Sequence, residues 1–118
     1  MTRLRRSLPA LLATFAACVA MPAPAGAASY VACAPVRDPY PGTRYEGVDL
    51  TRIRGLRMTC PATRWVARRA HRRALGLTPP RSGIRRFSWH GWRVTGDLRP
   101  ATDRYVARKG DRRVRWRF

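Results

Sequence analysis

The chain has 118 residues, which is enough for one domain at most, and it carries 25 basic residues against 6 acidic ones. The formal charge of +19 excludes an acidic surface and favours contact with anionic partners.

Residues 1–27 have the features of a secretory signal peptide. Met1–Ser7 is basic, Leu8–Met21 is apolar, and Ala25–Ala27 has the small-x-small form that signal peptidase recognises. We therefore predict cleavage before Ala28 and a secreted, extracellular product.

Two alternatives for this segment stay open. A membrane helix is disfavoured because the apolar run is short and is soon followed by Pro22 and Pro24. A lipid anchor on Cys18 is disfavoured because Phe15 fits a lipobox poorly and one chain anchors a protein only weakly.

The mature chain would be strongly cationic and poor in aliphatic residues. Loss of Arg3, Arg5 and Arg6 leaves 22 basic and 6 acidic residues, a formal charge of +16 on 91 residues. Leu, Ile, Val and Phe make up 16 of those 91, a fraction below the level at which disorder is expected for a highly charged chain. The four Trp and four Tyr offset this shortage because each ring buries a large area. We expect a small fold that needs a covalent link.

Two cysteines, Cys33 and Cys60, remain after cleavage. In an oxidising compartment they are expected to form a disulfide that closes a loop of about 27 residues and stabilises the fold by about 3.5 kcal/mol. Two free thiols or a metal pair are the alternative. We expect no metal site, because two thiolates without nearby His or acidic residues bind zinc poorly.

The first half of the mature chain contains an arm and a strand. Residues 28–47 are rich in Pro and Gly turn signals and are predicted to form an irregular arm held at Cys33. Val48–Met58 alternates in polarity and is predicted to be a strand. Ile53 breaks the alternation, which indicates a bulge near Arg52.

One helix is predicted over Pro61–Leu75. Thr59 or Cys60 would be the N-cap, Pro61 suits the first helical position, and Gly76 would end the helix. The expected apolar face holds Ala62, Val66, Ala70 and Ala74. Arg64, Arg68 and Arg72 follow at intervals of four on another face, and Arg69 and Arg73 lie nearer the apolar side.

The second half is predicted to be strands. After a linker over Leu77–Gly83, Ile84–Thr95 carries aromatic residues at alternate positions, with a kink at Gly91. Gly96–Asp103 is predicted to be a loop, and Arg104–Arg108 a short strand.

The last strand follows a turn over residues 109–111 and has the cleanest alternation in the chain. Its two faces carry Val114, Trp116 and Phe118 on one side and Arg113, Arg115 and Arg117 on the other. Together these elements predict an α+β fold. It is a small single domain over residues 48–118, with one helix packed on a three- to four-stranded antiparallel sheet and one disulfide.

Several of these positions resemble a known group of proteins. They are Gly55, the run Thr59–Arg64, Trp92, the run Arg108–Gly110, and the aromatic end at Trp116 and Phe118. This pattern is similar to the small secreted proteins of actinobacteria that have no assigned function, and it covers about residues 48–118. The resemblance implies a strand, a Gly-x-x-Cys-x-x-Ala-like helix start and a C-terminal hairpin. It implies no activity. Members often carry a second cysteine pair where this chain has Val94 and Val106.

Residues suited to catalysis are few. The acidic residues are scattered singly, and no phosphate-binding glycine loop or nucleophile elbow is present. His90 could be a general base in a small hydrolase or nuclease, but a strand histidine beside Trp89 and Trp92 is the favoured interpretation. His71, among arginines, is predicted to be a solvated helix residue. We expect no enzymatic activity and no cofactor.

The arginines form three sets in the sequence, and guanidinium groups pair well with phosphate. From the first and third sets we predict a polyanion site. A solvated surface without a partner is the alternative. The sets are Arg64, Arg68, Arg69, Arg72 and Arg73 in the helix; Arg85, Arg86 and Arg93 near the aromatic strand; and Arg112, Arg113, Arg115 and Arg117 at the end, of which Arg112 is not assigned to the site.

Three functional hypotheses follow. The first is a secreted cationic binding module that contacts an anionic polymer or membrane surface, with nucleic acid bound only non-specifically. The second is a protein-interaction or inhibitor domain with an unknown protein partner, and the third is the hydrolase that uses His90. Trp89, Trp92 and Trp116 could form a base-stacking platform, but we expect them to be core residues.

Overall fold

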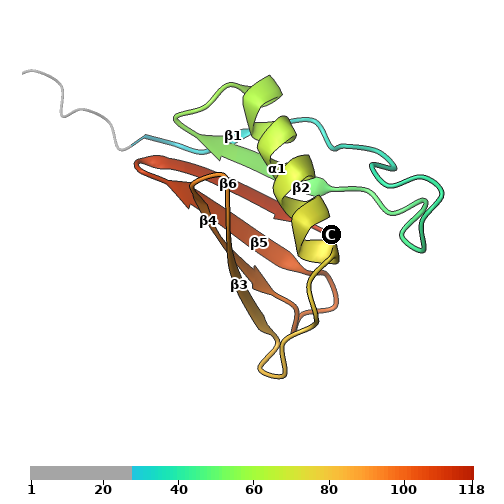
Figure 1. Cartoon of the computed structure of the whole chain (residues 1–118). Coiled ribbons are helices and arrows are strands. Elements are labelled where there is room, and N and C mark those ends of the chain that lie inside the picture. Colours follow the sequence, from blue (N-terminus) through green and yellow to red (C-terminus); the bar gives the residue numbers. More distant parts are fainter. Residues whose placement is uncertain (1–27) are drawn as a thin grey trace, which may run out of the picture.

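The computed structural model describes residues 28–118, so the predicted signal peptide and Cys18 lie outside the described residues. One helix, α1 (Cys60–Leu75), lies across one face of a six-stranded antiparallel sheet with the order β1-β2-β6-β5-β4-β3 (Figure 1). The strands are β1 (Val31–Ala32), β2 (Thr51–Leu56), β3 (Ile84–Trp89), β4 (Trp92–Asp97), β5 (Arg104–Lys109) and β6 (Arg112–Arg117).

The α+β class is confirmed, whereas the expected three to four strands are too few. The predicted kinked strand over Ile84–Thr95 is a hairpin, because His90 and Gly91 adopt φ of 45° and 79° and form a two-residue turn. Two positive φ values are typical of the tight turns that join antiparallel strands. β4 continues through Asp97, and the arm adds β1 at the other edge, where Val31 pairs with Gly55.

The bulge predicted near Arg52 is confirmed. The pairing of β2 with β6 shifts register between Thr51 and Arg54, and Arg52 has a φ of 47°. The strand itself is shorter than predicted, since Val48 and Met58 lie outside it. The extra residue at the bulge keeps Ile53, 1% exposed, on the buried face of the sheet.

The predicted helix signals are confirmed, and α1 starts one residue earlier than expected. The Thr59 hydroxyl caps the first turn by accepting a hydrogen bond from the Ala62 N–H at 3.4 Å, and Gly76 ends the helix. Val66, Ala70 and Ala74 are buried as predicted, but Ala62 is exposed at the end of the helix. Thr63, Ala67 and His71 complete the buried side.

The helix packs closely on β2 at a glycine. A Cβ on Gly55 would overlap the Thr63 hydroxyl oxygen, so only glycine fits at this crossing. The Thr63 hydroxyl donates a 2.8 Å hydrogen bond to the Thr59 carbonyl, which keeps the side chain folded along the helix. This contact sets the distance between α1 and the sheet.

Aromatic residues supply most of the core. Tyr105 and Trp116 stack as a cross-strand pair with ring centroids 5.3 Å apart, and the bare backbone of Gly96 leaves room for the Tyr105 ring. Trp92 and Trp116 are 4% and 1% exposed, so the core interpretation of these two tryptophans is confirmed. Trp89 is only half-buried.

The prediction that His71 is solvated is wrong, because its side chain is fully buried between α1 and the sheet. Its Nδ1 accepts a 3.0 Å hydrogen bond from the indole N–H of Trp116, and Phe118 and Tyr105 pack against the ring. The position falls on the helix face that carries Ala67 and Ala74. A polar ring is tolerated there because the neighbouring strand supplies a donor.

The disulfide between Cys33 and Cys60 is present, with the two Cα atoms 5.4 Å apart. It ties the arm to the first turn of α1, as the sequence predicts. By contrast, Val94 is buried beneath the helix while Val106 points to the opposite face of the sheet, so these two positions do not face one another as a disulfide requires.

Arg85 is also buried, and its inward position was not expected for a member of a basic surface set. Its guanidinium donates to the carbonyls of Ala74 at 2.7 Å and Leu77 at 3.3 Å, and to the Tyr105 hydroxyl at 3.3 Å. The carbonyls at a helix C-terminus carry partial negative charge, so Arg85 caps the end of α1.

Candidate functional site

The face of the sheet turned away from α1 is lined with arginines; we call it the outer face. Side chains alternate along each strand, so the residues between the buried ones point to this side. Its arginines come from five neighbouring strands and are Arg54, Arg86, Arg93, Arg104, Arg108, Arg113, Arg115 and Arg117.

Several of these arginines stand directly opposite one another. Arg108 pairs in register with Arg93 on one side and with Arg113 on the other. Further in-register pairs join Arg104 to Arg117 and Arg54 to Arg115. Like charges in cross-strand pairs destabilise a sheet, so the free protein holds these guanidinium groups together against their repulsion.

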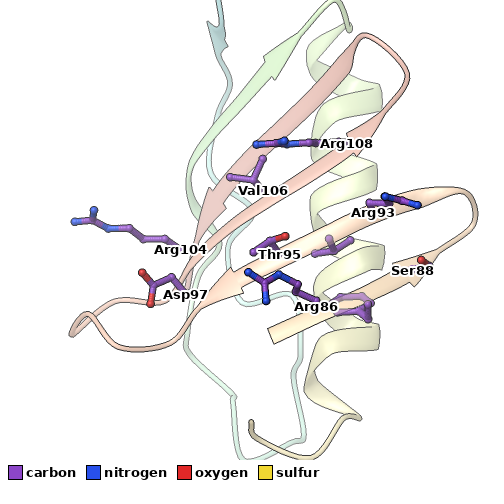
Figure 2. A pocket seen from close by; sticks show the side chains of 10 residues that line it. Arg86, Ser88, Arg93, Thr95, Asp97, Arg104, Val106 and Arg108 are labelled. Carbon is purple, nitrogen blue, oxygen red and sulfur yellow. The ribbon is translucent and has the colours of Figure 1, made fainter. Parts of the chain in front are cut away.

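A hollow of about 820 Å³ occupies the β3–β4–β5 part of this face; we call it the outer hollow. Its centre is uncharged, because Thr95 and Val106 are paired there. Figure 2 shows charged side chains spread around these two residues. The lining arginines are Arg86, Arg93, Arg104 and Arg108.

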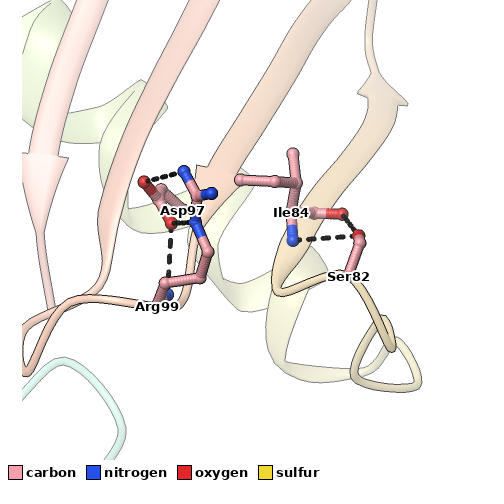
Figure 3. A network of polar contacts seen from close by, with 4 residues as sticks. All are labelled: Ser82, Ile84, Asp97 and Arg99. Atoms are coloured by element: carbon pink, nitrogen blue, oxygen red, sulfur yellow. Dashed lines mark hydrogen bonds and ion pairs between the residues drawn. The ribbon is translucent and has the colours of Figure 1, made fainter.

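Asp97 is the one carboxylate among the residues that line the outer hollow, and its negative charge is already paired with Arg99. Arg99 binds both of its oxygens, with the guanidinium Nε 2.9 Å from Oδ1 and the second contact at 3.1 Å (Figure 3). These hydrogen bonds from Arg99 lower the pKa of the Asp97 carboxyl, so it is ionised at neutral pH. Asp97 also stands in register opposite Arg104, but both of its oxygens are already bound by Arg99.

A second hollow of the outer face lies beside the outer hollow, toward β2 and β6, and we call the two together the two outer hollows. The arginines that line the second one are Arg52, Arg54, Arg104, Arg115 and Arg117. Desolvation first, and then the positive charges of Arg104, Arg52 and Arg54, lower the pKa of the Arg117 guanidinium. An arginine stays protonated despite such a lowered pKa, so the crowded guanidinium groups repel one another.

None of the ion pairs of the described residues includes an arginine of the outer face. Within residues 28–118 they join Arg37 to Asp49, Arg57 to Asp111, and Arg99 to Asp97. Two outer-face arginines have other contacts. Arg113 donates to the carbonyls of residues 110 and 112, and Arg115 lies 4.3 Å from the centre of the Tyr30 ring. The remaining guanidinium groups are available to a ligand.

The structure separates the predicted polyanion site into two parts. Arg113, Arg115 and Arg117 lie on the outer face, whereas the helix arginines lie on the opposite side of the sheet. Arg64 is engaged, because it donates to the carbonyls of Ala34 and Pro35 at 3.1 Å. The exposed helix arginines are Arg68, Arg69, Arg72 and Arg73. The two groups therefore do not form one surface.

Sequence reasoning left Arg54, Arg104 and Arg108 out of the predicted site, and it did not join Arg86 and Arg93 to the last strand. A signal was present in residues 104–108, where Tyr105 and Ala107 alternate with Arg104, Val106 and Arg108, so that two arginines fall on one face. Pairing those two strands in register brings their arginines onto one face.

His90, the residue considered for catalysis, lies in the β3–β4 turn. Its ring packs 4.7 Å from that of Trp89, and its carbonyl accepts a 3.2 Å hydrogen bond from Lys109 Nζ. The described part of the chain contains no cluster of three or more His, Cys, Asp or Glu that could hold a metal ion. Within the same residues, no helix has both the length and the apolar character needed to cross a membrane.

Comparison with known proteins found no matching family model, no matching curated protein and no matching solved structure. The function must therefore be inferred from the chemistry of the surface.

Proposed function

We propose that the protein is a secreted cationic module that binds linear phosphate-bearing polymers on its outer face. The observation that carries the proposal is the set of in-register arginine pairs, such as Arg93 with Arg108 and Arg54 with Arg115, none of which forms an ion pair with a carboxylate in the described residues. A bound polyanion would turn this repulsion into attraction, because each guanidinium can form two hydrogen bonds with phosphate.

The spacing of the charges favours a polymer over a single small anion. Along β6, arginines recur at every second residue, about 7 Å apart, and across the strands neighbours lie about 5 Å apart. The guanidinium groups are thus spread in a regular array over five strands and do not surround a single point. A chain with a charge on each repeat can satisfy many of them at once.

A phosphate polymer is also favoured over a lipid surface. Proteins that bind membranes at the interface usually insert apolar side chains between the headgroups. In the described residues the exposed large hydrophobic side chains are Val31, Val48 and Trp65, and none of them lines the two outer hollows. The cationic face alone would bind lipid only through its charge.

The test is a salt series with the mature protein, residues 28–118. Its ligands are a glycerol-phosphate polymer, single-stranded DNA, duplex DNA, a neutral polysaccharide and anionic vesicles. We expect binding to the phosphate polymers at about 0.15 M salt, where contacts between distant charges are screened. The slope of log affinity against log salt should change by about 0.7 to 0.9 for each phosphate contact.

Two triple variants with the same charge separate a specific face from general attraction. Arg93→Gln/Arg104→Gln/Arg108→Gln removes cations from the outer face, while Arg37→Gln/Arg44→Gln/Arg81→Gln removes three exposed cations elsewhere. We expect the first to lose at least about ten-fold in affinity and the second to lose much less. Equal losses, weak binding to every ligand that disappears by about 0.15 M salt, or binding to vesicles alone would contradict the proposal.

A further inference from the structure

A third hollow, of about 500 Å³, lies on the helix side of the sheet between α1 and the β3–β4 turn. We call it the tryptophan cleft, and its lining residues are Trp65, Arg69, Arg72, Arg73, Gly76, Trp89 and His90. The rings of Trp65 and Trp89 lie side by side, with centroids 5.7 Å apart. One indole comes from the helix and the other from the end of an edge strand.

Trp65 is not used by the core. It is 54% exposed, in a chain whose Trp92 and Trp116 are almost fully buried. Single exposed apolar residues are common on protein surfaces. Here, however, an exposed indole and a half-buried one adjoin in a hollow, which leaves aromatic surface available to a planar ring.

The cleft is cationic, and its lining residues include no carboxylate. The Arg69 guanidinium lies 5.6 Å from the centre of the Trp65 ring, and Arg72 and Arg73 lie on the same rim. His90 adopts a φ of 45°, in the left-handed region that is uncommon for residues other than glycine, and its ring lies 4.7 Å from that of Trp89. The cleft thus combines stacking surface with positive charge.

The cleft and the outer hollow meet at one hairpin. Ser88 and Arg93 pair in register and line the outer hollow, and the next residues, Trp89 and His90, line the cleft. β3 is an edge strand, so no further strand lies between the two faces at this end. A polymer on the outer face can pass around this edge and reach the indoles.

We propose that the polymer is a single-stranded nucleic acid, with bases stacked on Trp65 and Trp89 and phosphates held by Arg69 and Arg73. This inference rests on the proposed function, because it assumes that the outer face binds phosphodiesters. Among phosphodiester chains, single strands present planar rings that are free to stack, whereas duplex DNA keeps its bases paired. Stacking platforms beside cationic grooves are typical of proteins that bind single strands with little sequence preference.

The experiment compares a thymidine oligonucleotide with an abasic phosphodiester of equal length, at about 0.15 M salt, using affinity and tryptophan emission as readouts. We expect the wild type to bind the thymidine strand about ten-fold more tightly, with quenching of emission. Trp65→Ala should remove that preference and leave affinity for the abasic chain unchanged. Trp65→Phe should keep part of the preference, since a smaller ring still stacks.

A pair of charge variants checks the phosphate contacts. Arg73→Gln should weaken binding of the thymidine strand, and Arg81→Gln, which removes one exposed cation outside the cleft, should have little effect. If wild type and Trp65→Ala bind both chains equally, base stacking is excluded while the outer face remains a phosphate site. If neither chain binds, the proposed function itself fails.

Discussion

The indole N–H of Trp116 donates a 3.0 Å hydrogen bond to Nδ1 of His71, which holds the buried ring as the neutral tautomer with its proton on Nε2. Nε2 has no hydrogen-bond partner among the described residues and lies within an aromatic cluster that includes Tyr40, Tyr105 and Phe118. A positive charge would be poorly solvated there. Burial first, and the charge of Arg85 second, lower the pKa of His71 from 6.5 to about 3.

This shift predicts a loss of stability in mild acid. The unfolded chain takes up the histidine proton near pH 6.5 and the folded chain only near pH 3. The stabilisation is therefore complete above about pH 6.5 and falls as the pH drops, by about 1.4 kcal/mol per pH unit within that window. Urea unfolding at pH 7.5, 6 and 4.5 measures it. His71→Gln, which keeps an acceptor for Trp116 but does not titrate, should flatten the profile; an unchanged profile in that variant would assign the effect to other groups.

Gly55→Ala should destabilise the fold by about 1 to 3 kcal/mol, because the new methyl group overlaps the Thr63 hydroxyl. Thr63→Ala alone costs the hydrogen bond to the Thr59 carbonyl. The double variant should be more stable than the sum of the two single losses, since the overlap is relieved. Denaturant unfolding of the four proteins gives this coupling energy, and strict additivity would show that the crossing is looser than the structure indicates.

Replacement of Cys33 and Cys60 by serine should lower the free energy of unfolding by about 3 to 4 kcal/mol, because the closed loop of 27 residues no longer restricts the unfolded chain. Dithiothreitol should lower the stability of the wild type to a similar extent and leave the serine variant unaffected. The unfolding midpoint in urea measures both. A serine variant as stable as the wild type would mean that the arm contributes little to the folded state.

If the predicted signal peptide is removed before Ala28, the product has a single intact mass. It should equal residues 28–118 less two hydrogen atoms, and the unreduced protein should contain no thiol that reacts with an alkylating reagent. A longer product, or a lipid on Cys18, would overturn the predicted processing.

Asp97→Asn should strengthen polyanion binding by about three-fold, because it removes the carboxylate of the outer hollow and releases Arg99. The salt dependence should become steeper as one more cation takes part. Asp111→Asn makes the same change in net charge at a carboxylate that pairs with Arg57 and lines neither outer hollow, so it is the matched control. Equal gains in both variants would indicate that only total charge matters.

Much of the fold could be predicted from short stretches of the sequence. Thr59 and Gly76 mark the helix ends, and the broken alternation at Ile53 marks the bulge, because each depends on neighbouring residues alone. Gly91 was misassigned because a glycine within an alternating segment is compatible with either a kink or a turn. Its neighbour His90 is not a residue typical of such turns.

Features that depend on distant residues were not predictable in the same way. In the sequence, His71 lies among arginines and resembles a solvated residue. Its burial depends on the hydrogen bond from the indole of Trp116, which lies 45 residues later in the chain. The arginine surface of the outer face also depends on residues far apart in the sequence, since the pairing of β4, β5 and β6 in register decides which arginines become neighbours. The tryptophan cleft likewise joins the helix to a strand end, so Trp65 and Trp89 become neighbours only in the folded chain.

The buried guanidinium of Arg85 has a consequence for self-association. Exposed edges of sheets invite further strands and lead to aggregation, and proteins often prevent this with a charged side chain that points inward from the edge strand. Arg85 occupies that position in β3, while the opposite edge is formed by β1, which is only two residues long. A second copy that added a strand to β3 would have to accommodate this fixed charge. This inward charge opposes the addition of a strand at the β3 edge, and the shortness of β1 limits pairing at the other edge.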